Sequence, residues 1–133
     1  MPLVRFGVGL EEEVLKALDS FVVDNNLPNR SQAIRHLVEK NSVEKKWQCN
    51  HIVAGAIVML YDHHKGDVTV KSNDIQHEYY DVILSSQHFH LSHDNCLEII
   101  AVKGMANKLT QLSDKLIGIK GIIHGKLIMS KVE

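Results

Sequence analysis

Apolar residues in positions 1–47 follow one strand pattern and then two helix patterns. Over residues 3–9 every second side chain is apolar, and this alternation predicts a short strand. From residue 11 to 25, apolar residues recur at helical spacing after three glutamates, whose negative charge suits a helix N-terminus. A second helix is predicted to start with Ser31 as its N-cap and to fray around residues 45–47.

A strand followed by two short helices cannot enclose a core by itself. The strand has no pairing partner within residues 1–47, and each helix has an apolar stripe that needs cover. A homodimer solves both problems, because two copies of the strand can pair antiparallel while four helices enclose a shared core. The pattern therefore predicts a ribbon-helix-helix domain over residues 1–47.

The rest of the chain predicts a different kind of domain. Its apolar, β-branched stretches predict strands, and a weaker pattern is interpreted as a helix because strands flank it. The predicted elements are a strand at 52–61, a helix at 68–80, strands at 82–91 and 96–103, a helix after Gly104 and a strand at 122–129. This βαββαβ order is ferredoxin-like and is also that of small-molecule-sensing ACT domains. We therefore predict an α+β chain whose second, ACT-like domain spans residues 52–133.

Composition and charge exclude several classes of protein. The chain has 133 residues, 44% hydrophobic and 23% charged, which is typical of a folded protein rather than a disordered one. No apolar run approaches the roughly 20 residues that cross a bilayer. The N-terminus also lacks a secretory signal, so we predict a cytoplasmic protein with no membrane partner. Two cysteines are too few for a disulfide framework, whereas nine histidines are many for this length.

A metal site is the strongest candidate for the chemistry of this chain. His88 and His90 lie two positions apart in one predicted strand, so their imidazoles project from the same face. After a short turn, Cys96 opens the next strand and can return beside them. The candidate fourth ligands are His77, His93 or a water. Imidazole and thiolate ligands favour nickel, copper or zinc over magnesium or calcium.

Four motifs are spread over nearly the whole chain. They are Asn29-Arg30-Ser31 between the two predicted helices, Gln76-His77-Glu78, the run His88-x-His90-x5-Cys96-Leu97-Glu98, and His124-Gly125-Lys126-Leu127. Together they resemble the nickel-responsive transcriptional regulators, the NikR family. The resemblance implies that Ni(II) is bound by His88, His90 and Cys96 of one subunit, with His77 supplied by a neighbouring subunit. It also implies a homotetramer, a dimer of dimers, that binds double-stranded operator DNA and represses nickel-uptake genes when nickel is bound.

Further side chains are predicted to orient these ligands through hydrogen bonds. Glu98 lies two positions after Cys96, so it faces the same way. Gln76 precedes His77, and His63 follows the first strand of the second domain. The alternative for each is a solvent-facing polar residue at the end of an element.

Two groups of residues are predicted to contact DNA. They are Arg5, Gly7 and Gly9 on the outer face of the strand, and Asn29, Arg30 and Ser31 where the second helix begins. Arg5 can bind a guanine edge, but the glycines have no side chain where similar proteins carry hydroxyl residues. The helix terminus offers its free amides to a backbone phosphate. The resemblance also implies an interdomain cation held partly by two carboxylates, but the matching positions here are Gln32 and His36.

Three other functions remain open from the sequence. The chain could be a metal buffer or chaperone without DNA function, or a ribbon-helix-helix repressor that senses a small ligand through its ACT-like domain. The third is an enzyme with a catalytic metal, but the chain has no H-E-x-x-H motif, nucleophile elbow or phosphate loop. A fourth protein ligand at His77 would also close the coordination position that catalysis needs. We therefore expect no enzymatic activity.

Overall fold

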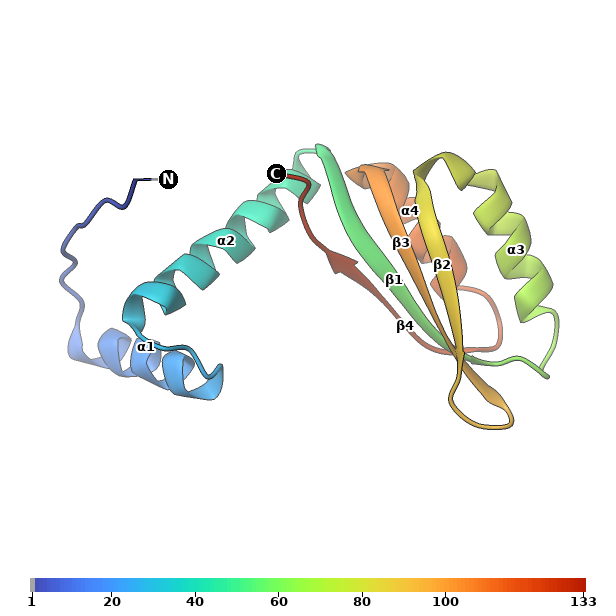
Figure 1. The fold of residues 1–133 in the computed structure, drawn as a ribbon, viewed down its shortest axis with the longest axis horizontal. Coiled ribbons are helices and arrows are strands. Elements are labelled where there is room, and N and C mark those ends of the chain that lie inside the picture. The colour runs from blue at the N-terminus through green and yellow to red at the C-terminus, as the bar shows by residue number, and fades with distance from the viewer. Residues whose placement is uncertain (1) are drawn as a thin grey trace. The chain divides into compact units, whose positions relative to one another are not determined.

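The computed structural model describes residues 2–133 (Figure 1). The chain forms two compact units, the first ending at Asn41 and the second spanning Ser42–Glu133. No helix within residues 2–133 has both the length and the apolar character needed to cross a lipid bilayer.

The first unit contains α1 (Glu12–Asp24) and the beginning of α2 (Arg30–Gln48). The extent of α1 agrees with the helix predicted from the apolar spacing. The cap of α2 is Asn29, whose side-chain Oδ1 accepts a hydrogen bond from the backbone N–H of Gln32 at 2.9 Å. The prediction that Ser31 caps this helix is therefore wrong, because an asparagine two positions earlier already satisfies one of the free amides.

Side-chain contacts fix the end of α2. Trp47 is 8% exposed and belongs to the hydrophobic core of the second unit. Its indole Nε1 donates a hydrogen bond to the carbonyl oxygen of Ser130 at 2.8 Å. Because these contacts hold the last turn, the helix continues to Gln48 and the predicted fraying around residues 45–47 does not occur.

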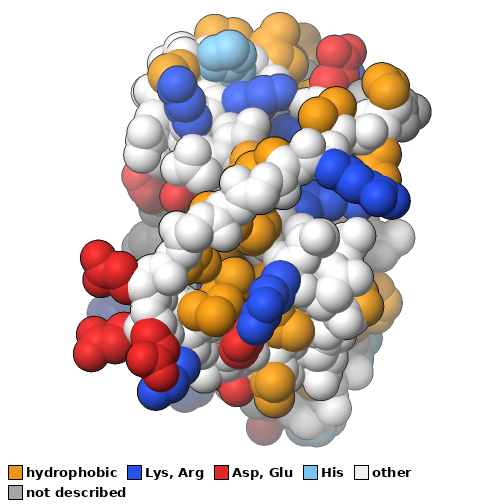
Figure 2. Space-filling model, turned by 90° about the vertical axis from the view of Figure 1, so that its left-hand side faces the viewer, with side chains coloured by type: hydrophobic (Ala, Val, Ile, Leu, Met, Phe, Trp, Pro, Cys, Tyr) orange, Lys and Arg blue, Asp and Glu red, His pale blue; other side chains and the backbone are white. Residues whose placement is uncertain are grey.

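Residues 2–10 contain no regular secondary structure in the single chain. The strand predicted over residues 3–9 is absent there, because a strand is held by hydrogen bonds to a neighbouring strand and one copy offers none. The apolar side chains of this segment are open to solvent, with Val4 82% and Phe6 76% exposed. The face drawn in Figure 2 likewise carries exposed apolar side chains between acidic and basic ones. The paired ribbon stays a prediction about a second copy.

The second unit is built on a four-stranded sheet with two main helices. Its elements are β1 (Ile52–Asp62), α3 (Val68–Glu78), the short 3-10 helix η1 (Tyr80–Val82), β2 (Ile83–His90), β3 (Asn95–Met105), α4 (Ala106–Ile117) and β4 (Ile122–Met129). The strand order is β2-β3-β1-β4, and every neighbouring pair is antiparallel. This topology confirms the predicted βαββαβ, ferredoxin-like arrangement.

The core of the second unit joins the sheet to α4. Along β1, buried side chains alternate with less buried ones over much of the strand, as expected where one face of a sheet is covered. The buried side chains include Ile57 and Met59 of β1 and Leu109 and Leu116 of α4. Because the apolar residues of α4 recur at helical spacing, they form one stripe that packs into this core.

The strand register brings three chain segments to one end of the sheet. β1 ends at Asp62 opposite Asn95, the first residue of β3, and β2 ends at His90 opposite Cys96. The residues that follow β1, end β2 and begin β3 are therefore neighbours although they are far apart in the sequence (Figure 1).

Candidate metal centre

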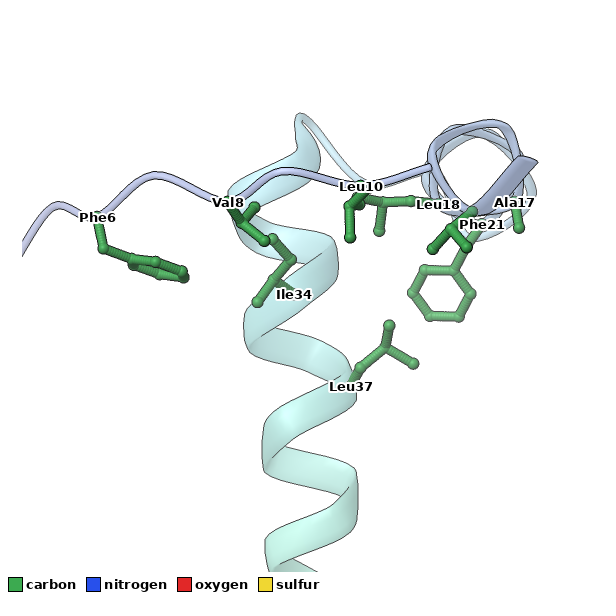
Figure 3. Close-up of a pocket in the computed structure, with 9 residues that line it drawn as sticks. Phe6, Val8, Leu10, Ala17, Leu18, Phe21, Ile34 and Leu37 are labelled. Atoms are coloured by element: carbon green, nitrogen blue, oxygen red, sulfur yellow. The ribbon is translucent and has the colours of Figure 1, made fainter. Parts of the chain in front are cut away.

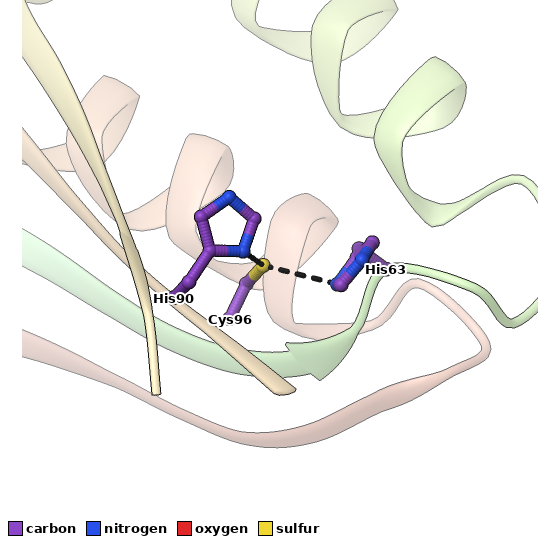
Figure 4. A group of neighbouring side chains, drawn as sticks. All are labelled: His63, His90 and Cys96. Carbon is purple, nitrogen blue, oxygen red and sulfur yellow. Dashed lines mark hydrogen bonds between the residues drawn. The ribbon is translucent and has the colours of Figure 1, made fainter. Parts of the chain in front are cut away.

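Three potential metal ligands meet at this end of the sheet (Figure 4). Cys96 Sγ lies 3.3 Å from His63 Nδ1 and 3.4 Å from His90 Nδ1. One donor atom from each of the three residues lies within 4.8 Å of the other two. The cysteine is 4% exposed and His90 is open to solvent, so the group lies at the edge of the core.

Strand pairing explains why these side chains meet. Cys96 of β3 is paired with Tyr61 of β1 on one side and with His90 of β2 on the other. Paired residues of antiparallel strands point to the same face, so the imidazole of His90 lies beside the sulfur. The backbone N–H of His63 donates to the carbonyl oxygen of Asp94 at 3.1 Å, which ties it to the turn before Cys96. The structure thus brings His90 and Cys96 together and adds His63, which the sequence suggested only as a hydrogen-bond partner.

His88 lies two residues before His90 and contacts a different set of side chains. It is paired with Glu98 across β2 and β3. Its Nδ1 lies 3.4 Å from the hydroxyl oxygen of Tyr61, and its Nε2 lies 3.5 Å from Glu98 Oε2. His88 is therefore on the same strand face as His90 but is not one of the three donors gathered around the sulfur.

His77 also lies outside this group. It is in the last turn of α3, where its side chain is exposed and its ring centroid is 6.5 Å from that of Tyr80. The single chain does not bring its imidazole among the three donors around Cys96.

Glu98 is a buried carboxylate with three hydrogen-bond donors. It is 1% exposed and accepts hydrogen bonds from the Tyr61 hydroxyl at 3.1 Å and from Gln76 Nε2 at 2.8 Å. A third hydrogen bond comes from Ser86 Oγ at 2.7 Å. Burying a carboxylate is costly unless such donors compensate for the lost water. The network links α3, β1, β2 and β3, because each of the four residues comes from a different element.

The surroundings of Tyr61 raise the pKa of its hydroxyl well above the ordinary value. Burial is the main cause because it penalises the charged phenolate, and the charge of Glu98, the hydrogen bond to Glu98 and the charge of Cys96 act in the same direction. Tyr61 therefore stays protonated and donates its hydroxyl proton to Glu98. His88 contacts the same pair, with Nδ1 3.4 Å from the phenol oxygen and Nε2 3.5 Å from Glu98 Oε2.

The donor set around Cys96 fits nickel. Imidazole nitrogen and thiolate sulfur are ligands that nickel, copper and zinc accept and that magnesium and calcium do not favour. With metal–ligand bonds of about 2.0–2.3 Å, two ligands of one cation lie roughly 3–4.5 Å apart. The observed spacing within 4.8 Å is close to that range, so small side-chain rotations bring the three donors onto one ion.

The residues predicted to contact DNA belong to the first unit. They are Arg5, Gly7 and Gly9 before α1, and Asn29, Arg30 and Ser31 at the start of α2, and all are exposed. Arg30 forms a bidentate pair with Asp19, with Nε–Oδ1 at 2.8 Å and Nη2–Oδ2 at 3.0 Å. This hydrogen bonding lowers the pKa of Asp19 and raises that of Arg30. The pair joins α1 to the start of α2 and leaves Nη1 of the guanidinium for another anion.

Comparison with known proteins identifies relatives over nearly the full chain. Residues 54–130 match the family described as the NikR C-terminal nickel-binding domain. A protein of Syntrophus aciditrophicus is 51% identical over 98% of this chain and 95% of its own length. Proteins of Chlorobium phaeobacteroides and Pyrococcus horikoshii are 44% and 42% identical over 98% of this chain, and the matches cover 98% and 95% of their own lengths. All three relatives carry the provisional name of nickel-responsive regulator.

One solved structure has a similar fold. It is that of an uncharacterised protein from Thermotoga maritima, with a TM-score of 0.54 and 15% sequence identity over 59% of this chain and 98% of that one. At this identity the similarity concerns the fold alone.

Proposed function

The chain belongs to the family of nickel-responsive regulators that carry the NikR C-terminal nickel-binding domain, and from this premise we propose that it is a transcriptional regulator whose binding to DNA depends on nickel. Family membership makes it a nickel-binding regulator and not an enzyme. The observation that carries the proposal is the approach of His90 Nδ1 to 3.4 Å from Cys96 Sγ, with His88 on the same face of β2. These residues lie on the neighbouring strands β2 and β3, so a metal held there would join the two strands.

The proposed nickel ligands are His88, His90 and Cys96 of one subunit together with His77 of the partner subunit. His88 and His90 share one face of β2, and Cys96 is the pairing partner of His90. In this assignment the exposed His77 completes a site between two copies, which links metal binding to assembly.

The buried network is proposed to couple the nickel ligands to α3. Gln76 and His77 are neighbours on this helix, and Gln76 donates to Glu98, the pairing partner of His88. A change at either end of the network is therefore transmitted through direct hydrogen bonds. His63 acts beside it as a hydrogen-bond partner of the Cys96 sulfur.

Residues 1–47 are proposed to form a ribbon-helix-helix domain with a second copy, and residues 52–133 the metal-binding and tetramerisation domain. An apolar cavity of about 500 Å³ in the first unit supports this assignment (Figure 3). It is lined by Phe6, Val8, Leu10, Val14, Ala17, Leu18, Phe21, Ile34 and Leu37. Two copies that pair their N-terminal segments would bury this apolar surface in one shared core.

The DNA surface is proposed to lie on the outer side of that dimer. Arg5 would contact a base edge, and the start of α2, where Asn29 caps the helix, would hold a backbone phosphate with Arg30 and Ser31 nearby. Gly7 and Gly9 would allow a close backbone approach instead of side-chain contacts. Two such dimers in a homotetramer would bind operator DNA in the cytoplasm and repress nickel-uptake genes when nickel is ample.

The test compares two cysteine variants of the full chain. Cys96→Ala removes the proposed sulfur ligand, whereas Cys49→Ala removes an exposed cysteine outside the site. DNA from the promoter regions of nickel-uptake genes is titrated with each protein, with and without nickel. We expect nickel-dependent binding by the wild type and by Cys49→Ala, and its loss in Cys96→Ala. Equal nickel dependence in both variants would refute the proposed site, and nickel binding without any DNA binding would support a metal buffer instead.

A further inference from the structure

A second group of metal-binding side chains lies on the turns beside the sulfur site. It consists of His64, in the turn after β1, and His93 and Asp94, in the turn between β2 and β3. Each residue offers a donor atom that lies within 4.8 Å of the other two. All three side chains are exposed, and the group shares no residue with the one around Cys96.

Backbone hydrogen bonds hold the two turns together. The backbone N–H of His64 donates to Asp62 Oδ1 at 2.9 Å, which fixes the first turn. The backbone N–H of His63 donates to the carbonyl oxygen of Asp94 at 3.1 Å, which joins the first turn to the second. The second turn is closed by Leu91, whose N–H donates to the carbonyl oxygen of Asn95 at 2.9 Å. The three donors are therefore carried on backbone segments whose separation is set by the fold.

The present contacts within the group are weak ones that a cation can replace. His64 Nε2 lies 3.3 Å from the carbonyl oxygen of His93 and 3.8 Å from Asp94 Oδ1. The ring centroids of His64 and His93 are 5.3 Å apart. With bonds of about 2.0–2.2 Å to nitrogen and oxygen, ligands of one cation lie roughly 3–4 Å apart. Closing the group from its present spacing requires only rotation of exposed side chains.

We propose that His64, His93 and Asp94 form a second cation site for a divalent transition metal such as nickel, cobalt or zinc. Two imidazoles and one carboxylate suit these ions, whereas magnesium and calcium favour sites made of oxygen alone. The site has no thiolate and leaves its remaining coordination positions to water. It therefore binds nickel more weakly than the sulfur site and exchanges it faster. A bound ion crosslinks the two turns that carry His63 and lead into Cys96.

The test measures nickel bound by the full chain in equilibrium dialysis, with nickel alone as the probe. Nickel bound to the thiolate gives a charge-transfer absorption band, so the band reports the sulfur site and the dialysis reports every site. For the wild type we expect a second class of bound nickel that adds no intensity to this band. His64→Ala and His93→Ala should lose the second class and keep the band. His124→Ala is the matched control, because it removes an exposed imidazole of β4 outside both groups.

A Cys96→Ala background separates this inference from the proposed function. In that variant the thiolate band disappears, and the weaker class should persist until His64 is also replaced. A millimolar excess of magnesium should not displace it. The inference is overturned if His64→Ala and His93→Ala bind as much nickel as the wild type, or if His124→Ala loses as much nickel as they do.

Discussion

Removing the carboxylate of Glu98 should destabilise the second unit, because three donors lose their acceptor. In Glu98→Ala, hydrogen bonds from Tyr61, Gln76 and Ser86 are lost. Hydrogen bonds to charged groups contribute about 1.5–3 kcal/mol each, and breaking a buried charged network by removing one partner costs about 3–5 kcal/mol. Gln76 keeps Ser72 as a partner at 2.9 Å, and Ser86 is exposed enough to turn to water. We therefore expect a loss of about 3 kcal/mol in the free energy of unfolding, at the lower end of that range.

Glu98→Gln is the control, because it keeps the shape of the side chain and one carbonyl acceptor. It should cost about 1–2 kcal/mol, less than Glu98→Ala, since the carbonyl still accepts from Tyr61. The new amide group replaces the oxygen that accepted from Gln76 and Ser86, and the Gln76 amide can turn its own oxygen towards it. Denaturant unfolding of the metal-free protein, followed by tryptophan fluorescence, measures both variants. Trp47 is the single tryptophan and lies in the core of this unit, so the signal reports its unfolding. The reasoning is refuted if Glu98→Ala stays within about 1 kcal/mol of the wild type, or if the two variants are equally destabilised.

Three further predictions concern the helices and the N-terminal segment. Trp47→Ala should lower the free energy of unfolding by about 3–5 kcal/mol. Trp47→Phe should lower it by less, because phenylalanine loses the hydrogen bond to Ser130 but keeps a packed ring. Denaturant unfolding followed by circular dichroism measures both variants. Arg30 lowers the pKa of Asp19 in the folded state, so their pair stabilises the fold above the unfolded pKa and is lost as pH falls through the folded one. Asp19→Asn should remove this part of the acid dependence in a pH series of unfolding curves, and an unchanged pH dependence would contradict it. Phe6→Asp should weaken the proposed N-terminal dimer at least about a hundredfold, since burial of phenylalanine contributes about 1.5–3 kcal/mol in each copy; unchanged sedimentation of the full chain would count against the ribbon.

The elements of the second unit could be predicted because their apolar patterns are typical of strands and helices with one face packed against a core. β4 was predicted at 122–129 and has these bounds, and β1 ends one residue later than predicted. α2 was harder, because contacts distant in sequence set its end. The indole of Trp47 reaches Ser130, and no local pattern near residue 47 indicates that contact. The Asn29 cap of α2 was readable in principle, since asparagine is as good a cap as serine.

The candidate site could be predicted only where strand periodicity applies. His90 and Cys96 lie on two strands joined by a short turn, so their proximity follows from the hairpin. His63 reaches the sulfur through the pairing of β1 with β3, and sequence alone does not give that register. The group of His64, His93 and Asp94 was missed for the same reason, because it forms between turns of strands that are not consecutive. The crowded histidines around residue 63 were the available signal.

Both proposed functional regions are incomplete in a single copy, and this bears on how they are coupled. Within residues 2–133, the segment before α1 pairs with no strand, and His77 lies outside the donors around Cys96. If further copies of this chain complete both regions, then nickel binding and DNA binding each favour the assembled protein over separate chains. A ligand that binds the assembled form more tightly shifts the equilibrium towards it, and the effect is reciprocal, so DNA must also strengthen nickel binding. Coupling of this kind needs no continuous series of residue contacts between the nickel site and the DNA surface, because the two ligands act through a shared assembly equilibrium.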